Sequence, residues 1–213
     1  MLSLNTESLL QNHYMEAGLW MPRDLPLEAH GGWESPTCQL RGHFLGHWLS
    51  AAAHAWANTA DAELKGKADF IISELARCQA ENGGEWVFSI PPTYLEWALR
   101  GKKVWAPHYT LHKTLMGLVD MATLGGNPQA LEVLARAARW FTRFTAPLSR
   151  AQLDDLLDVE TGGMLEAWAD LYALPGDPQH LALMPRYHRP RLFDPLLEGA
   201  DVLTNRHANT TIP

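Results

Sequence analysis

Two histidines, His43 and His47, stand four residues apart in the segment RGHFLGHW. In a helix this spacing places both imidazole rings on one face. Three kinds of chemistry fit such a pair: metal ligation, hydrogen bonds to a bound substrate, or hydrogen bonds within the core. A zinc protease would need H-E-x-x-H with glutamate as the base, and Phe44 stands in the glutamate position. We therefore expect no metal here and favour a substrate pocket, with core packing as the alternative.

The same spacing recurs in the segment HYTLH, at His108 and His112, with Tyr109 between them and Trp105 shortly before. A neutral imidazole donates one hydrogen bond and accepts another, which suits the hydroxyl groups of a sugar. Nine tryptophans point the same way, because flat aromatic rings stack on sugar rings. The alternative is that these aromatic side chains pack helix against helix.

Two carboxylates, Glu166 and Asp170, share one helical face in the segment GGMLEAWAD. Paired carboxylates are typical of glycosidases, but acids four residues apart on a helix more often form a solvated face. We expect Glu166 to bind a hydroxyl group and not to act as the general acid. Glu34, in GGWES, either contacts a substrate or caps the following helix, and the sequence does not separate these roles.

Helical patterns must position these side chains. Residues 40–57 show a period of 3.6, with a broad apolar face. A second stripe carries His43, His47, Ser50 and His54, where a surface helix would carry lysine and glutamate. This stripe predicts a helix that lines a concave polar surface.

Further helices are predicted over residues 58–79, 108–124, 127–144, 164–174 and 177–188, with residues 82–93 as a loop. We expect Pro185 to cut the last of these helices short. The junctions LGGNPQAL and LPGDPQHL both read glycine, cap residue, proline, helix, which indicates repeated helical hairpins. No segment shows the alternation typical of strands. We expect one all-α domain over residues 1–213, whose hairpins stack as a solenoid or curve into an α/α toroid.

Composition excludes several classes of function. The formal charge is −7 and no basic stripe is present, so we expect no nucleic-acid partner. No apolar run approaches the ~20 residues of a membrane span, so we expect no membrane partner. The N-terminal residues lack the pattern of a signal peptide, which favours a cytoplasmic protein. Cys38 and Cys78 form no CxxC motif, which argues against a thiolate zinc site.

Four segments together resemble a known family. GGWESPTCQLRGHFLGHWLSA, VWAPHYTLHKTLMGLVD, GGMLEAWADLYALPGDPQHL and HANTTIP are similar, in this order, to successive motifs of the bacterial beta-L-arabinofuranosidase glycoside hydrolases. The resemblance extends from about Leu4 to Pro213. It implies an (α/α)6 barrel, followed in family members by β-sandwich domains.

The resemblance also implies where catalysis takes place. In family members a cysteine nucleophile, zinc bound by further cysteines and a glutamate, and an acid/base glutamate lie beyond the HANT motif. Cys38 and Cys78 do not match these positions, so we expect residues 1–213 to form the N-terminal portion of the barrel, inactive alone and without zinc. The reaction of the completed enzyme would be retaining hydrolysis of an arabinofuranoside.

The residues expected to bind such a sugar come from all four motifs. They are His43, His47, Trp105, Tyr109, His112, Glu166, His207 and Asn209. Two alternative functions remain: a non-catalytic carbohydrate-binding module and a helical interaction protein. Because half of a toroid leaves helix faces without neighbours, we also expect a homodimer.

Overall fold

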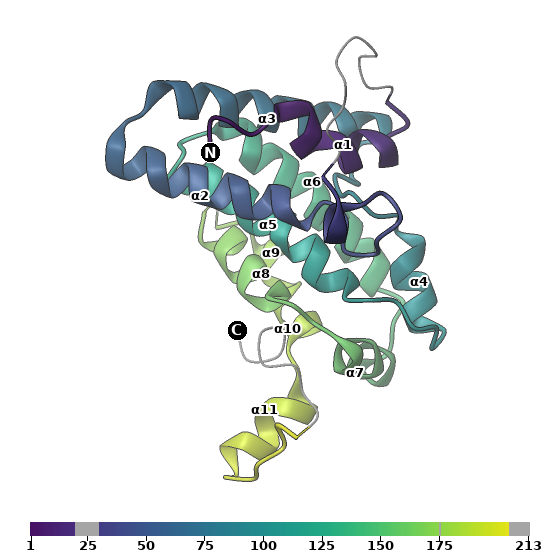
Figure 1. The fold of residues 1–213 in the computed structure, drawn as a ribbon. Helices are drawn as coiled ribbons and strands as arrows, with labels where there is room; N and C mark the ends of the chain where they lie inside the picture. Colours follow the sequence, from purple (N-terminus) through teal and green to yellow (C-terminus); the bar gives the residue numbers. More distant parts are fainter. Residues whose placement is uncertain (20–29, 175, 205–213) are drawn as a thin grey trace.

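The computed structural model describes residues 1–19, 30–174 and 176–204 (Figure 1). Helices are its only regular elements within these ranges, which confirms the all-α prediction. The helices are α1 (Thr6–Glu16), the short 3-10 helix η1 (Gly32–Glu34), α2 (His43–Thr59), α3 (Ala62–Glu81), α4 (Thr93–Leu99), α5 (Pro107–Thr123), α6 (Pro128–Thr145), α7 (Arg150–Val159), α8 (Met164–Ala173), α9 (Pro178–Leu181), α10 (Met184–Tyr187) and α11 (Pro190–Leu197).

The predicted capping signals start the helices where the sequence places them. Asp61 accepts hydrogen bonds from the backbone at the start of α3, and Asn127 accepts one from Ala130 N at the start of α6. Pro128 and Pro178 occupy the first turns of α6 and α9. These residues satisfy N–H groups that have no partner inside the helix, so short local patterns set the element boundaries.

Helix α5 is the centre of the arrangement. It packs against α2, α6 and α8, while α3 lies against α1, α2 and α6 (Figure 1). Glycines allow α2 and α5 to approach closely. A Cβ atom added to Gly46 would lie 1.9 Å from the Lys113 carbonyl oxygen, and one added to Gly117 would lie 2.7 Å from the Gly46 carbonyl oxygen. The close contact of these two helices fixes the spacing of the side chains that they carry.

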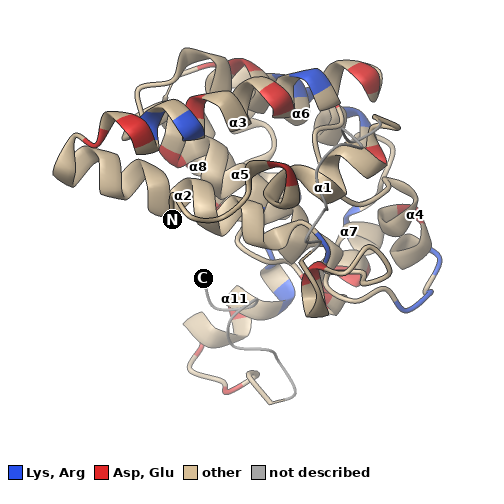
Figure 2. Ribbon diagram, turned by 45° about the horizontal axis from the view of Figure 1, so that its top comes forward, with Lys and Arg blue, Asp and Glu red and all other residues tan. Residues whose placement is uncertain are grey.

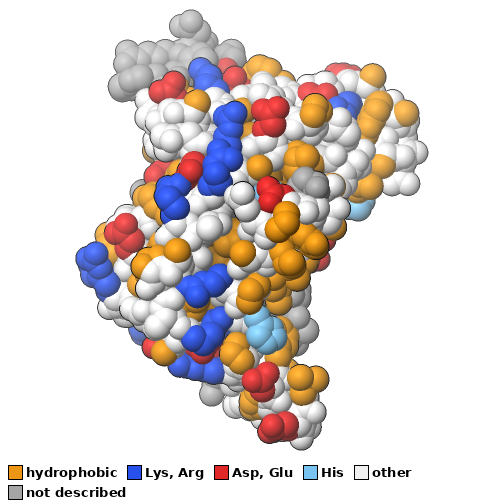
Figure 3. Space-filling view, turned by 180° about the vertical axis from the view of Figure 1, so that it is seen from behind, with side chains coloured by type: hydrophobic (Ala, Val, Ile, Leu, Met, Phe, Trp, Pro, Cys, Tyr) orange, Lys and Arg blue, Asp and Glu red, His pale blue; other side chains and the backbone are white. Residues whose placement is uncertain are grey.

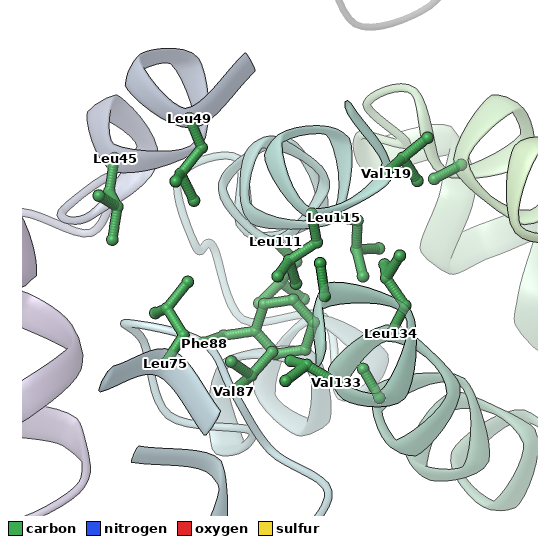
Figure 4. Packing of buried hydrophobic residues seen from close by; sticks show 14 of the residues in the cluster. Leu45, Leu49, Leu75, Val87, Phe88, Leu111, Leu115, Val119, Val133 and Leu134 are labelled. Carbon is green, nitrogen blue, oxygen red and sulfur yellow. The ribbon is translucent and has the colours of Figure 1, made fainter. Parts of the chain in front are cut away.

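Leucine and aromatic side chains fill the space between the helices. Leu45 and Leu49 of α2 and Leu111 and Leu115 of α5 are buried together with Phe88 from the segment between α3 and α4 (Figure 4). At ~25 cal/mol per Å² of buried apolar surface, burial of this layer stabilises the packing of α2 against α5.

Charge is divided unevenly among the helices. Helix α2 contains no lysine, arginine, aspartate or glutamate, whereas α3 and α6 carry both signs on their outer faces (Figure 2). The polar residues of α2 are histidine, serine, asparagine and threonine. This distribution agrees with the prediction that α2 is not an ordinary surface helix.

The helix predicted to begin at Asp177 ends before Pro185, as expected, because α9 ends at Leu181. A second short helix, α10, follows, and Pro185 lies in its first turn. Proline has no N–H to donate and fits a first turn, where that N–H would have no partner inside the helix. Among the helices not predicted, α7 begins with a capping box of Ser149 and Gln152.

Helix α11 extends away from the rest of the structure (Figure 1). Its Leu197 is 86% exposed, and Leu196 is exposed as well. Seen from behind, the molecule shows further hydrophobic side chains at its surface, gathered between charged ones (Figure 3). No helix in the described ranges is long and apolar enough to cross a membrane.

Candidate functional site

The first two turns of α2 and α5 and the first turn of α8 bring the predicted side chains together. His47 Nε2 of α2 lies 3.3 Å from Tyr109 Oη of α5. His112 Nε2 of α5 lies 4.0 Å from Glu166 Oε2 of α8. We call His43, His47, Tyr109 and His112 the histidine cluster. Three separate sequence motifs therefore meet at one place.

His43 and His47 occupy the α2 side of the cluster. Their ring centroids are 6.0 Å apart, and the His43 ring is 5.9 Å from that of Tyr109. His43 is buried, while His47 remains partly exposed. Burial lowers the pKa of His47, with smaller contributions from Lys113 and His43, so its imidazole is neutral at pH 7. A neutral ring is both a donor and an acceptor of hydrogen bonds.

Glu34 caps α2, which decides between the two roles that the sequence left open. One carboxylate oxygen accepts a hydrogen bond from Gly42 N at 2.8 Å, and the other accepts one from Phe44 N at 3.0 Å. The same carboxylate lies 2.6 Å from His43 Nδ1. Glu34 therefore acts as a buried anchor beneath the cluster.

His112 lies under the start of α8. A Cβ atom added to Gly163 would lie 2.4 Å from His112 Nε2, so only glycine leaves room for the ring there. Burial lowers the pKa of His112 to about 3, with help from Lys113 and His47. The Glu166 side chain is 61% exposed, so it stands at the rim beside a neutral imidazole and forms no buried ion pair.

Two exposed tryptophans border the cluster. Trp33 is 62% exposed and its ring lies 6.3 Å from that of His43. Trp105 is 52% exposed and packs edge-on against Trp33 at 6.1 Å. Trp33 lies within the motif GGWESPTCQLRGHFLGHWLSA, but its spacing from His43 is not a helical one and does not identify it as a site residue. The exposed indole rings of Trp33 and Trp105 present flat apolar surfaces beside the cluster.

His108 does not belong to the cluster, although it shares the spacing of His43 and His47. Its side chain is fully buried and packs edge-on against Tyr187 at 5.8 Å. Burial lowers its pKa to about 4. Its Nδ1 lies 3.0 Å from the Glu160 carbonyl oxygen. His108 is thus a core residue.

Glu160 is a structural residue that sequence reasoning missed. Its carboxylate accepts hydrogen bonds from His108 N at 2.9 Å and Tyr109 N at 2.6 Å. It therefore caps α5 from about fifty residues away in the chain, a contact that no local pattern signals. Burial raises the pKa of Glu160 to about 8, although the two N–H groups and Arg189 oppose this shift.

The polar stripe of α2 continues away from the cluster but becomes exposed. Ser50 Oγ donates to Asp120 Oδ2 at 2.5 Å. His54 Nε2 lies 3.9 Å from the same carboxylate, and its side chain is 61% exposed. Only the first part of the predicted stripe therefore lies in enclosed surroundings.

A cavity of about 420 Å³ lies elsewhere, between the ends of α1, α3 and α6. It is lined by Glu16, Asn82, Gly83, Glu85, Trp86, Pro92, Trp140 and Arg143. None of these residues belongs to the histidine cluster. The cavity and the cluster are separate features of the molecule.

The side chains present do not form a zinc site. In the described ranges, no three histidine, cysteine, aspartate or glutamate side chains gather as metal ligands. Burial raises the pKa of the Cys78 thiol to about 12, so it is a poor thiolate donor at neutral pH. His207 and Asn209 lie outside the described residues.

The chain is similar to a known protein family. A family model described as "Beta-L-arabinofuranosidase, GH127 catalytic domain" matches residues 1–213. The chain therefore belongs to this glycoside hydrolase family. A search of curated proteins finds no match.

Proposed function

We propose that this chain supplies part of the sugar pocket of a glycoside hydrolase and does not hydrolyse a sugar alone. The pocket would take a terminal arabinofuranoside or a similar sugar. Membership of the beta-L-arabinofuranosidase family supports the substrate class. The observation that carries the proposal is the contact of His47 Nε2 with Tyr109 Oη, since it joins two predicted sugar-binding motifs.

The chemistry of the cluster suits a neutral polyhydroxylated ligand. Lowered pKa values keep His47 and His112 uncharged, so each can accept a hydrogen bond from one hydroxyl and donate to another. The Tyr109 hydroxyl adds a further donor. Trp33 and Trp105 offer exposed rings at the border. Such a site favours a sugar over a charged metabolite.

The lack of hydrolysis rests on the roles available to the described residues. A retaining glycosidase needs a nucleophile and an acid/base about 5–5.5 Å apart. Glu34 is occupied by His43 and two backbone N–H groups, and Glu166 is largely exposed. We propose that the reacting groups come from a part of the enzyme beyond these residues, in a closed barrel.

Titration of the chain with methyl β-L-arabinofuranoside, followed by calorimetry or NMR, tests the proposal. We expect saturable binding that weakens about tenfold in His47→Ala, which corresponds to the loss of one good hydrogen bond. His54→Ala is the matched control, because His54 lies on the same helix about 10 Å further along the axis. Absence of saturable binding in the wild type, or release of free arabinose by this chain alone, would contradict the proposal.

Self-association is a second proposal, supported by the exposed leucines of α11. Leu197 is 86% exposed and Val159 is 61% exposed, and such side chains favour contact between copies of the chain. Light scattering over a wide concentration range tests this. A constant mass of 23.8 kDa at every concentration would exclude the homodimer.

A further inference from the structure

Three N–H groups and one imidazole nitrogen surround the Glu34 carboxylate. Gly42 N and Phe44 N donate to its two oxygens, and Asn12 Nδ2 lies 3.3 Å from the oxygen that Gly42 binds. The fourth neighbour is His43 Nδ1 at 2.6 Å. Burial alone would raise the pKa of Glu34, but hydrogen bonds from His43 and Phe44 outweigh it, and the net pKa is lowered. Glu34 is therefore ionised at neutral pH and only accepts.

The surroundings of His43 Nδ1 leave one choice of tautomer. Besides Glu34 Oε1, its only close polar neighbour among the described residues is the Leu40 carbonyl oxygen at 2.9 Å. Both neighbours are acceptors, so Nδ1 must carry a hydrogen. In a neutral imidazole the other nitrogen, Nε2, then presents a lone pair. The ring itself lies among Trp33, His47 and Tyr109.

We propose that Glu34 is a positioning residue that holds His43 as the Nδ1–H tautomer, so that Nε2 is a fixed acceptor for a ligand hydroxyl in the histidine cluster. That the ligand is a sugar rests on the proposed function, whereas the tautomer of His43 rests on geometry alone. This arrangement fixes which nitrogen of His43 donates a hydrogen bond and which one accepts. A carboxylate fixes the imidazole in the same way when it orients a catalytic or metal-binding histidine.

The structure also explains why a carboxylate is required at this position. Glutamine has one acceptor oxygen and an NH2 group that only donates. In Glu34→Gln the NH2 group would face at least one of the donors Gly42 N, Phe44 N and His43 Nδ1–H. Where the NH2 group takes the place of Oε1, it faces Phe44 N and His43 Nδ1–H, and His43 relieves its contact by turning its ring or moving its hydrogen to Nε2. Where it takes the place of Oε2, it faces Gly42 N instead, so we expect a mixture of the two forms. Glu34→Asp keeps the charge and shortens the side chain by one CH2 group.

Long-range 1H–15N spectra of 15N-histidine-labelled protein measure the tautomer directly. In the wild type we expect His43 as Nδ1–H. In Glu34→Gln we expect a mixture or the Nε2–H form, together with about tenfold weaker binding of methyl β-L-arabinofuranoside. In Asn12→Ala the Glu34 carboxylate loses a hydrogen bond of 3.3 Å and the Glu34 carbonyl oxygen loses one of 2.9 Å, but His43 Nδ1 keeps both of its acceptors, so the tautomer of His43 should stay unchanged. Thermal unfolding of each variant shows whether it folds.

Two results would overturn the proposal. One is a wild-type His43 that carries a hydrogen on Nε2 at neutral pH, either as the Nε2–H tautomer or as the doubly protonated imidazolium; this result needs no variant to fold. The other is a folded Glu34→Gln protein whose His43 remains fully Nδ1–H. Failure of the proposed function looks different: the wild type would show the expected tautomer but no saturable binding of the arabinofuranoside.

Discussion

The two pairs of histidines, His43/His47 on α2 and His108/His112 on α5, have the same spacing and different surroundings. On α2 both members lie in the histidine cluster, and His43 is held by the carboxylate of Glu34. On α5 only His112 does, because His108 is fully buried against Tyr187. Spacing therefore shows which residues share a helical face, but the neighbouring elements decide whether that face meets a ligand or the core.

Both helix starts are capped by a carboxylate from outside the helix, and the two caps differ in chemistry. Glu34 is paired with an imidazole and its pKa is lowered. Glu160 binds two backbone N–H groups, and burial raises its pKa to about 8. The α2 cap is thus charged and linked to the cluster, whereas the α5 cap serves the core.

The largest expected effect on stability comes from a substitution that pushes apart α2 and α5, the helices that carry the two histidine pairs. Gly46→Ala places a Cβ atom against the Lys113 backbone, which cannot move without shifting α5. We expect a loss of about 3 kcal/mol in the free energy of unfolding, at the upper end of overpacking costs. Denaturant unfolding followed by circular dichroism measures it.

Gly66→Ala on α3 is the matched control for this helix glycine. Nothing lies within 4 Å of the added Cβ, so alanine should stabilise the helix by up to about 1 kcal/mol. Equal effects of both substitutions would show that α2 and α5 are not in close contact.

Because His108 lies in the core and His47 in the histidine cluster, replacing His108 should mainly lower stability, whereas replacing His47 should mainly weaken sugar binding. His108→Ala leaves a cavity beside Tyr187 and should lower the free energy of unfolding by about 2–3 kcal/mol. His47→Ala removes a partly exposed ring and should cost less than about 1 kcal/mol while weakening sugar binding. Equal destabilisation by the two would remove the distinction.

The cap of α5 should give the protein a dependence on pH. The folded pKa of Glu160, about 8, exceeds its ordinary value of 4.5. Its contribution to stability is therefore complete below pH 4.5 and is lost as the pH rises toward 8, by at most about 1.4 kcal/mol per unit. Glu160→Gln lacks this titration, so the difference in unfolding free energy between the two proteins should change over that window. A difference that is constant between pH 5 and 8 would contradict it.

The smallest change tests the place of His112. Gly163→Ala adds one methyl group against the imidazole, at a residue whose backbone any amino acid can adopt. We expect a change in unfolding free energy of about 1 kcal/mol and altered NMR signals of His112, with those of His108 unchanged. Unaltered His112 signals would place the ring elsewhere.

Much of the fold follows from local patterns in the sequence. Asp61 and Asn127 start helices because their side chains satisfy local N–H groups, and the period of residues 40–57 predicts α2. The predicted site residues with described positions also meet, because they lie within or just before the first two turns of packed helices. Their role in binding a sugar stays a prediction, as does closure of a barrel.

The parts of the fold and of the site that the sequence does not predict depend on contacts between distant segments. Glu160 caps α5 across about fifty residues, and Gly163 matters only because His112 lies beneath it. The burial of His108 depends on Tyr187, which comes from α10. No periodicity or spacing in the sequence reports such contacts. A pair of residues four apart therefore carries less information than the elements packed against it.

The central claim is that the cluster histidines, and not His108, meet the sugar. Titration of 15N-histidine-labelled chain with methyl β-L-arabinofuranoside tests it in one experiment. We predict that imidazole signals of His43, His47 and His112 shift together in a saturable way, while those of His108 and His54 stay constant. Saturable shifts confined to His108 or His54, or no shifts at any histidine, would contradict the claim.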